Sequence, residues 1–136
     1  MYENMRRYLM GFKIFTEYGA SSRNEATLRV SGYLFISNAI LKRLNVDTSG
    51  EEIQQGAILL FDEDSNLLGI KLSEEYDQKQ QDQRKLSKEQ SGAAINILPL
   101  LRFYGFDKPT EKHLLKVDVR ENMYVIDLSE IKLKKI

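Results

Sequence analysis

The fold is decided by the stretch SGYLFISNAILKRLNVD at residues 31–47, which returns in altered form as SGAAINILPLLRFYGFD at residues 91–107. The two stretches align without a gap, and several further positions keep their apolar or basic character. A recurring segment indicates an internal repeat, which constrains the architecture more than any single short motif does. The identical pairs are Ser31 and Ser91, Gly32 and Gly92, Leu41 and Leu101, and Asp47 and Asp107.

The repeat continues after a loop whose length differs between the copies. AILLFDEDSNLLGIKLS at residues 57–73 aligns with HLLKVDVRENMYVIDLS at residues 113–129. In both segments apolar residues alternate with polar ones on either side of a polar turn, which predicts a β-hairpin. We therefore place repeat one at residues 26–73 and repeat two at residues 91–129. The identical pairs are Leu59 and Leu115, Asp62 and Asp118, Asn66 and Asn122, Leu72 and Leu128, and Ser73 and Ser129.

Each unit is predicted to begin with a strand that leads directly into a short helix. The strands are expected at Tyr33–Ile36 and Ala93–Ile97. Ser37 is a candidate N-cap, because its hydroxyl can accept from a backbone N–H that the helix leaves unpaired. In the second unit Pro99 suits the first helical position, where a missing N–H costs nothing.

The two helices are predicted to end in register, at Asn45 and Gly105. These residue types best tolerate the left-handed conformation that closes many helices. The hairpins are expected to turn at Asp64–Asn66 and Arg120–Asn122. Each unit thus reads as a strand, a helix and a hairpin.

Three segments lie outside these units. Phe12–Tyr18 has a strand-like composition, and Ala26–Val30 is expected to pair near it or to lead into the first unit. The segment Glu74–Gln90 has almost no apolar residues and is predicted to be a solvated linker, residues 74–90, without a core of its own. Because one unit exposes an apolar face that it cannot cover, we expect residues 1–136 to form a single α+β, mainly β domain, in which two strand-helix-hairpin repeats pack as an intrachain pseudo-dimer.

The composition is that of an ordinary globular chain. It has 136 residues, of which 42% are hydrophobic, and no cysteine. Disulfides and thiolate sites are therefore excluded, and we expect a cytoplasmic protein. The apolar run after Arg6 and Arg7 is too short for a signal sequence. No run approaches the roughly 18 apolar residues of a membrane span, so we expect no membrane association.

The charge is balanced overall but unevenly distributed. The chain has twenty basic and twenty acidic residues. Basic residues outnumber acidic ones by 7 to 4 in residues 1–47 and by 11 to 7 in residues 83–136, whereas residues 48–82 carry 2 basic and 9 acidic residues. A fold that joins the outer thirds on one face would have a basic surface, and the alternative is a simple dipolar protein.

The segment GYLFISNAILKRLNV followed by GAILLFDEDSNLLGIKL resembles the swapped-hairpin proteins related to AbrB, MazE and MraZ. The resemblance covers Leu28–Leu72 and, more weakly, Ser91–Leu128. Ser37 and Asn45 stand where these proteins usually have proline and glycine. The resemblance implies an AbrB-like fold and double-stranded DNA binding in transcription regulation. It also implies a homodimer or, in a chain with two units, a monomeric pseudo-dimer.

Carried onto this chain, the resemblance implies DNA-binding roles for Arg29, Lys42, Arg43 and Arg102. Lys and Arg contact backbone phosphates whatever the base sequence, so phosphate contact would be their first role. The alternative is that Lys42, Arg43 and Arg102 only solvate the outer faces of their helices near the C-terminal end of the helix dipole.

Other chemistry has little support in the sequence. His113 is the only histidine and is expected to be a surface residue at a strand start. Asp62-x-Asp64-x-Asn66 imitates the start of a calcium loop, but a hairpin turn accounts for these residues, because positions six and twelve are Leu67 and Ser73. We expect no metal, no cofactor and no enzymatic activity.

The aromatic residues Tyr33, Phe35, Phe103, Tyr104 and Phe106 could stack on single-stranded bases. The repeat aligns Phe35 with Ile95 and Phe106 with Val46, so core packing is expected for those two. The sequence therefore favours a small DNA-binding regulator. The alternative is a protein-interaction module, antitoxin-like or an accessory protein of a mobile element, that binds a protein partner and no nucleic acid.

Overall fold

The computed structural model describes residues 24–106, 108–129 and 131, and in this part the fold is mainly β with two short helices. The predicted strand at Phe12–Tyr18 lies outside the described residues. In the first half of the chain the elements are β1 (Glu25–Leu28), β2 (Tyr33–Ser37), α3 (Asn38–Leu41), the 3-10 helix η1 (Lys42–Leu44), β3 (Gly56–Asp62) and β4 (Leu67–Leu72). In the second half they are β5 (Gln83–Lys85), β6 (Ser87–Glu89), β7 (Gly92–Asn96), α4 (Leu98–Phe103), β8 (His113–Arg120) and β9 (Met123–Asp127).

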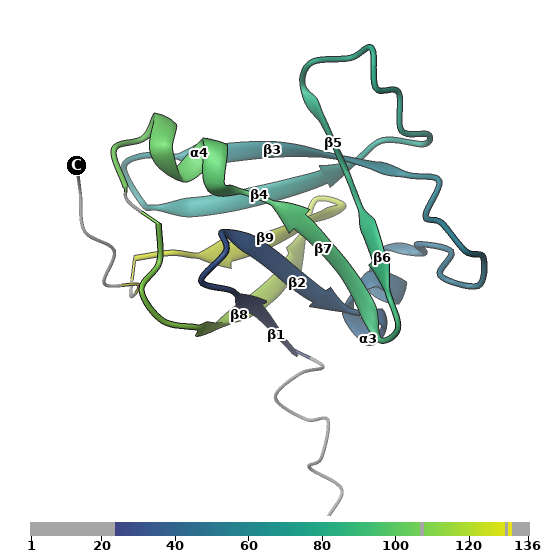
Figure 1. Ribbon diagram of the computed structural model, residues 1–136, viewed down its shortest axis with the longest axis horizontal. Coiled ribbons are helices and arrows are strands. Elements are labelled where there is room, and N and C mark those ends of the chain that lie inside the picture. The colour runs from purple at the N-terminus through teal and green to yellow at the C-terminus, as the bar shows by residue number, and fades with distance from the viewer. Residues whose placement is uncertain (1–23, 107, 130, 132–136) are drawn as a thin grey trace, which may run out of the picture.

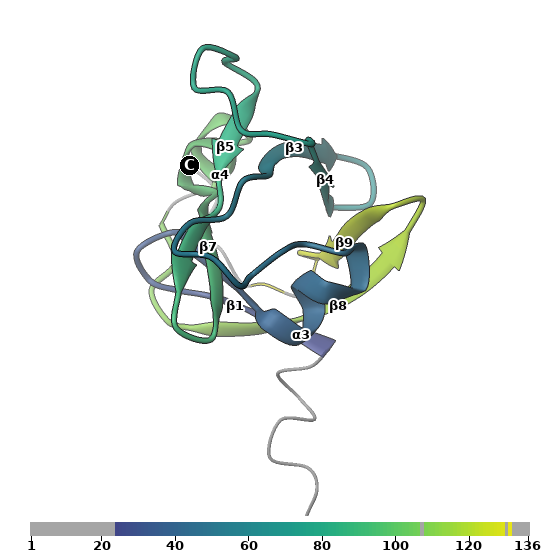
Figure 2. The same ribbon diagram turned by 90° about the vertical axis from the view of Figure 1, so that its right-hand side faces the viewer.

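The nine strands form one sheet that closes on itself almost completely. Their order is β5-β3-β4-β9-β8-β1-β2-β7-β6, and all neighbours are antiparallel. The two end strands, β5 and β6, are consecutive in the chain with only Leu86 between them. Viewed from the side chosen in Figure 2, the strands therefore follow one another around a nearly closed barrel.

The predicted arrangement of two units packed on each other is wrong. Both stretches do contain a strand, a short helix and a hairpin in that order. Their strands, however, are interleaved in a single barrel, because β2 pairs with β7 and β4 pairs with β9. The first strands of the hairpins also pair across the chain, β3 with β5 and β8 with β1. Neither unit covers the other as a separate body.

The segment predicted to be a solvated linker, residues 74–90, is only partly a loop. Its second half forms β5 and β6, which close the barrel by pairing with β3 and β7. Leu86, between them, is buried in the core with 1% of its surface exposed. β5 pairs with β3, which is distant in the sequence, whereas β6 forms a tight hairpin with β7, which follows it directly.

The caps and turns predicted from single residues are confirmed. The Ser37 hydroxyl accepts from the Ile40 N–H at 3.4 Å and caps α3. Asn45 and Gly105 both adopt the left-handed conformation, with φ of 59° and 82°. Asn66 and Asn122 also have positive φ, in the two hairpin turns.

The core fills the interior of the barrel with apolar side chains from nearly every element. One polar group lies among them, because the hydroxyl of the fully buried Tyr124 donates to the Leu41 carbonyl at 2.8 Å. Burial raises the pKa of Tyr124 well above its ordinary value, so this donor stays protonated. The largest fully buried residues besides Tyr124 are Leu28, Leu34, Ile36, Ile40, Leu41, Leu68, Ile70, Leu86, Ile95, Ile97 and Leu101.

Candidate functional site

The side chain of Arg29, which was predicted to bind DNA, is bound to another side chain of the protein. Both of its terminal nitrogens donate to the Glu89 carboxylate at 2.8 Å, and its guanidinium lies 4.9 Å from the centre of the Phe35 ring. Phe35, expected in the core, instead lies on the opposite face of β2 from Leu34 and Ile36, half-buried. There it packs so closely on Gly92 that a Cβ at that position would come within 2.7 Å of the ring.

The other predicted DNA-binding residues do not form one surface. Lys42 and Arg43 are exposed on η1, directly after α3, and Arg102 is exposed on α4. Figures 1 and 2 both place α3 and α4 at different ends of the barrel. The fold therefore keeps Arg102 away from Lys42 and Arg43, and no basic face joins the two repeats through these residues.

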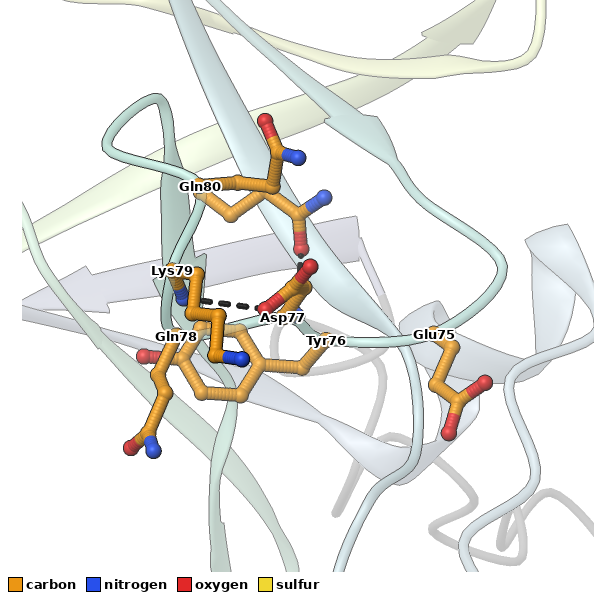
Figure 3. Close-up of a pocket in the computed structure, with 7 residues that line it drawn as sticks. Glu75, Tyr76, Asp77, Gln78, Lys79 and Gln80 are labelled. Atoms are coloured by element: carbon orange, nitrogen blue, oxygen red, sulfur yellow. Dashed lines mark hydrogen bonds between the residues drawn. The ribbon is translucent and has the colours of Figure 1, made fainter.

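A polar hollow of about 690 Å³ lies in the loop that projects from the barrel before β5 (Figure 3). Consecutive residues of this loop line it, and their polar groups bond to one another. The Asp77 carboxylate accepts from the Lys79 N–H at 2.9 Å, and the Gln83 side-chain oxygen accepts from the Asp77 N–H at 3.0 Å. These bonds account for the shape of the loop, so we place the candidate site elsewhere.

The candidate site begins at an unpaired backbone edge. On one side, every residue of β3 from Ala57 to Asp62 pairs with β4. On the other side β5 pairs only with Gly56–Ile58, since turns at Asp77–Gln80 and Gln80–Gln83 direct the chain away. Among the described residues, Leu59–Asp62 has no strand on this side. We call this stretch the β3 edge.

Aromatic side chains from α4 and the residue after it lie next to the β3 edge. The ring of Tyr104 lies 4.6 Å from that of Phe61, centroid to centroid. Phe103 contacts Tyr104 edge-on at 5.0 Å and is itself 81% exposed, the largest exposure among the large hydrophobic residues that the structure describes. An aromatic row thus runs outward from the strand into solvent.

Three hollows border the β3 edge. Two lie between the strand and α4, with volumes of about 370 Å³ and 380 Å³, and Phe103 and Tyr104 line both. The third, of about 450 Å³, is an apolar groove on the outer face of the two hairpins. Its residues are Leu60, Phe61, Asp62, Leu67, Gly69, Arg120, Glu121, Met123 and Val125. Leu60, 45% exposed, lies in this groove, whereas Leu59 and Phe61 line the hollows next to α4.

Carboxylates stand at both ends of the β3 edge. Asp62 and Glu63 border the hollows at the hairpin turn, and Asp82 lies at the other end together with Arg84. Hydrogen bonds from Ser65 and Asp64 hold the pKa of Asp62 below its ordinary value. Asp62 is therefore ionised at neutral pH, and the site combines an apolar middle with one acidic end, at the hairpin turn, and one end of mixed charge, at Asp82 and Arg84.

The calcium-like residues form a hairpin turn, as predicted, and His113 is the first residue of β8. In residues 24–106, 108–129 and 131, no group of three His, Asp or Glu side chains is placed to hold a metal ion. None of the described helices has the length and hydropathy of a membrane span.

Sequence reasoning missed the β3 edge and the role of Phe103. The edge depends on where β5 begins, because its first residue, Gln83, pairs with Ile58, and no local pattern encodes that position. Phe103 could have been recognised as a surface position, because the repeat aligns it with Arg43. Phe106, by contrast, packs against the core as expected.

No protein-family model, curated protein or solved structure matches this chain.

Proposed function

We propose that this protein is a non-enzymatic protein-interaction module that binds a protein partner at the β3 edge and the adjoining aromatic row. The observation that carries this proposal is the exposure of Phe103 beside an apolar, unpaired strand edge. Exposed aromatic side chains beside apolar strand residues are typical anchors of protein interfaces. The cytoplasmic location and the monomeric or homodimeric state stay predictions.

The charges around the β3 edge also favour a protein partner over nucleic acid. Asp62 and Glu63 would repel a phosphate backbone, and the chain has no net positive charge to compensate. Arg29, which the sequence assigned to DNA, is neutralised by Glu89. A protein surface with basic side chains meets no such repulsion.

DNA binding by an AbrB-like regulator is the second candidate, and the exposed neighbours Lys42 and Arg43 on η1 are the observation that favours it. The repeated order of strand, helix and hairpin is compatible with this assignment. Phosphate contacts through these residues would give an affinity for random duplex DNA that falls steeply with rising salt.

Two matched variants separate the candidates. Phe103→Asp is expected to abolish retention of a protein partner on the immobilised protein, and Lys42→Ala/Arg43→Ala is expected to leave it intact. Fluorescence anisotropy with labelled duplex DNA is run on the same variants at low and moderate salt. Retention of the partner by Phe103→Asp, with an unchanged melting temperature, would contradict the interaction proposal. Salt-sensitive DNA binding lost in the double variant would support the regulator.

A further inference from the structure

We propose, resting on the interaction function above, that the partner contributes an extended peptide segment that pairs with the β3 edge as an additional strand. The segment has apolar side chains in its centre and basic residues at the end that lies beside Asp62 and Glu63. Its main chain would bond to Leu59–Asp62, and its side chains would enter the hollows on the two faces of the strand.

The backbone of β3 supplies the first part of the recognition. β5 already pairs with Gly56–Ile58 on this side, so a peptide in line with β5 would continue an existing ladder. The four residues of the β3 edge correspond to about 13 Å of strand at about 3.3 Å per residue. Strand addition of this kind obtains affinity from main-chain hydrogen bonds and specificity from alternate side chains.

The side chains of the β3 edge supply the second part. Successive residues of a strand point to opposite faces. Leu59 and Phe61 line the hollows next to α4, and Leu60 lies in the groove on the outer face. A paired peptide would therefore place alternate side chains against Phe103 and Tyr104 on one face and against Leu60 on the other.

The charges supply the third part. Asp62 and Glu63 stand at one end of the edge, so lysine or arginine near that end of the peptide would find opposite charge, whereas Asp82 at the other end is balanced by Arg84. The middle of the edge is lined by leucine and aromatic side chains, which favour apolar residues in the centre. An acidic peptide of the same shape would be repelled.

Apart from α4, which lies beside it (Figure 1), the β3 edge itself carries little of the usual protection against strand addition. Natural sheets block exposed edges with charged residues, proline, bulges or covering segments. Leu59, Leu60 and Phe61 are all apolar, and the register with β4 continues without a bulge to Asp62. An unprotected apolar edge next to an exposed aromatic side chain is the arrangement expected of a binding edge.

The test uses the full chain and a fluorescein-labelled short peptide with valine in its centre and lysine near its ends. We expect saturable binding with a Kd on the order of 100 μM. Backbone NMR shifts are expected to map to residues 59–62 and 103–104. N-methylation of the peptide at alternate residues, on the side that faces β3, removes donors and should weaken binding by about tenfold or more. Replacing lysine by glutamate should abolish binding.

Protein variants complete the test. Leu60→Lys is expected to weaken peptide binding by about tenfold or more, since it charges the groove. Leu114→Lys, which removes another exposed leucine on β8, is the matched control and should bind as the wild type does. Equal binding of the N-methylated peptide, shifts outside the β3 edge, or the absence of saturable binding would overturn the strand-addition proposal.

The failures of the two proposals are distinguishable. If Phe103→Asp loses the protein partner but no peptide binds, the interaction function stands and strand addition is wrong. If Phe103→Asp keeps the partner, the interaction function itself is wrong. Concentration-dependent dimerisation in sedimentation velocity that Leu60→Lys abolishes, without peptide binding, would assign the edge to a second copy of the chain and overturn the peptide proposal.

Discussion

The hairpins β3–β4 and β8–β9 have equivalent places in the barrel, yet their outer edges differ. The start of β3 is covered by β5 and the start of β8 by β1, and among the described residues the remainder of each strand has a partner on one side only. In β8 this remainder, Val117–Arg120, alternates valine with charged residues, and Arg120 forms an ion pair with Asp118 at 3.1 Å. In β3 it is Leu59–Asp62, which is apolar up to its last residue.

The helices of the two repeats differ in the same sense. The alignment of the repeats places Lys42 with Arg102 and Arg43 with Phe103. The first helix thus carries two cations where the second has a cation and an exposed phenyl ring. The same order of elements occurs twice, and among the described residues the β3 edge with α4 is the more apolar of the two equivalent regions.

The largest change in stability is expected at Leu86, directly after the strand β5 that covers the start of β3. Leu86→Ala should lower the free energy of unfolding by about 2–5 kcal/mol, since it leaves a cavity at the buried joint between β5 and β6. Chemical denaturation measures the change. Lys85→Ala, at an exposed neighbour, should stay within about 0.5 kcal/mol of the wild type. If Leu86→Ala leaves the free energy of unfolding unchanged, β5 does not depend on Leu86. The cover that β5 gives to β3 would then differ from the cover that β1 gives to β8.

The second-largest change in stability concerns the core-facing side chains of the two hairpins. The repeat aligns Tyr124 of the second hairpin with Leu68 of the first, and only Tyr124 bonds to a helix. Tyr124→Phe should destabilise by about 1–3 kcal/mol, because it leaves the buried Leu41 carbonyl without its donor. Thermal and urea unfolding provide the measurement. At the aligned position, Leu68→Met should lower the free energy of unfolding by less than about 1.5 kcal/mol. Equal losses in the two variants would mean that the Tyr124 hydroxyl makes no difference between the repeats.

The helix ends provide a smaller effect. Gly105→Val should cost about 1–2 kcal/mol, because φ at this position is 82° and a side chain there is strained. A Cβ at Gly105 would meet nothing within 4 Å, so the cost comes from the backbone alone. Gly105→Asn, which copies Asn45 of the first repeat, should recover most of the loss in melting temperature. Equal melting temperatures for Gly105→Val and the wild type would contradict the left-handed cap.

The smallest effect concerns the ion pairs. Hydrogen bonds from Arg29 hold the pKa of Glu89 below its ordinary value. The pair therefore stabilises the fold above the ordinary glutamate pKa of about 4.3, and this contribution is lost as the pH falls through the lowered pKa. Both side chains are more than one third exposed, so at most about 1 kcal/mol is expected. Unfolding measured from neutral to acid pH should show a smaller loss in Glu89→Gln than in the wild type, and parallel curves would rule out this role.

Features set by neighbouring residues could be predicted from the sequence. The Ser37 cap, the left-handed Asn45 and Gly105 and the hairpin turns all follow from a few adjacent side chains. The strands that lead into the helices follow in the same way, since their apolar residues are adjacent in the chain. Local sequence patterns were therefore enough to predict which elements each repeat contains.

Features that depend on distant pairing could not be predicted. β5 and β6 contain no apolar residue, and β5 becomes a strand because β3, which is distant in the sequence, lies beside it. Phe35 was assigned to the core by its alignment with Ile95, but the pleat directs it to the opposite face. The β3 edge exists because β5 begins only at Gln83, opposite Ile58, a start that the polar sequence does not specify.

The interleaved strand order has a consequence for the loop at residues 77–80. The pairings β1–β8, β2–β7, β3–β5 and β4–β9 each join a strand before this loop to a strand after it. A polypeptide cut in the loop would thus leave two fragments that are each incomplete and mutually complementary. Neither fragment could bury its apolar residues alone, and the two would recover the barrel only by reassembling with each other.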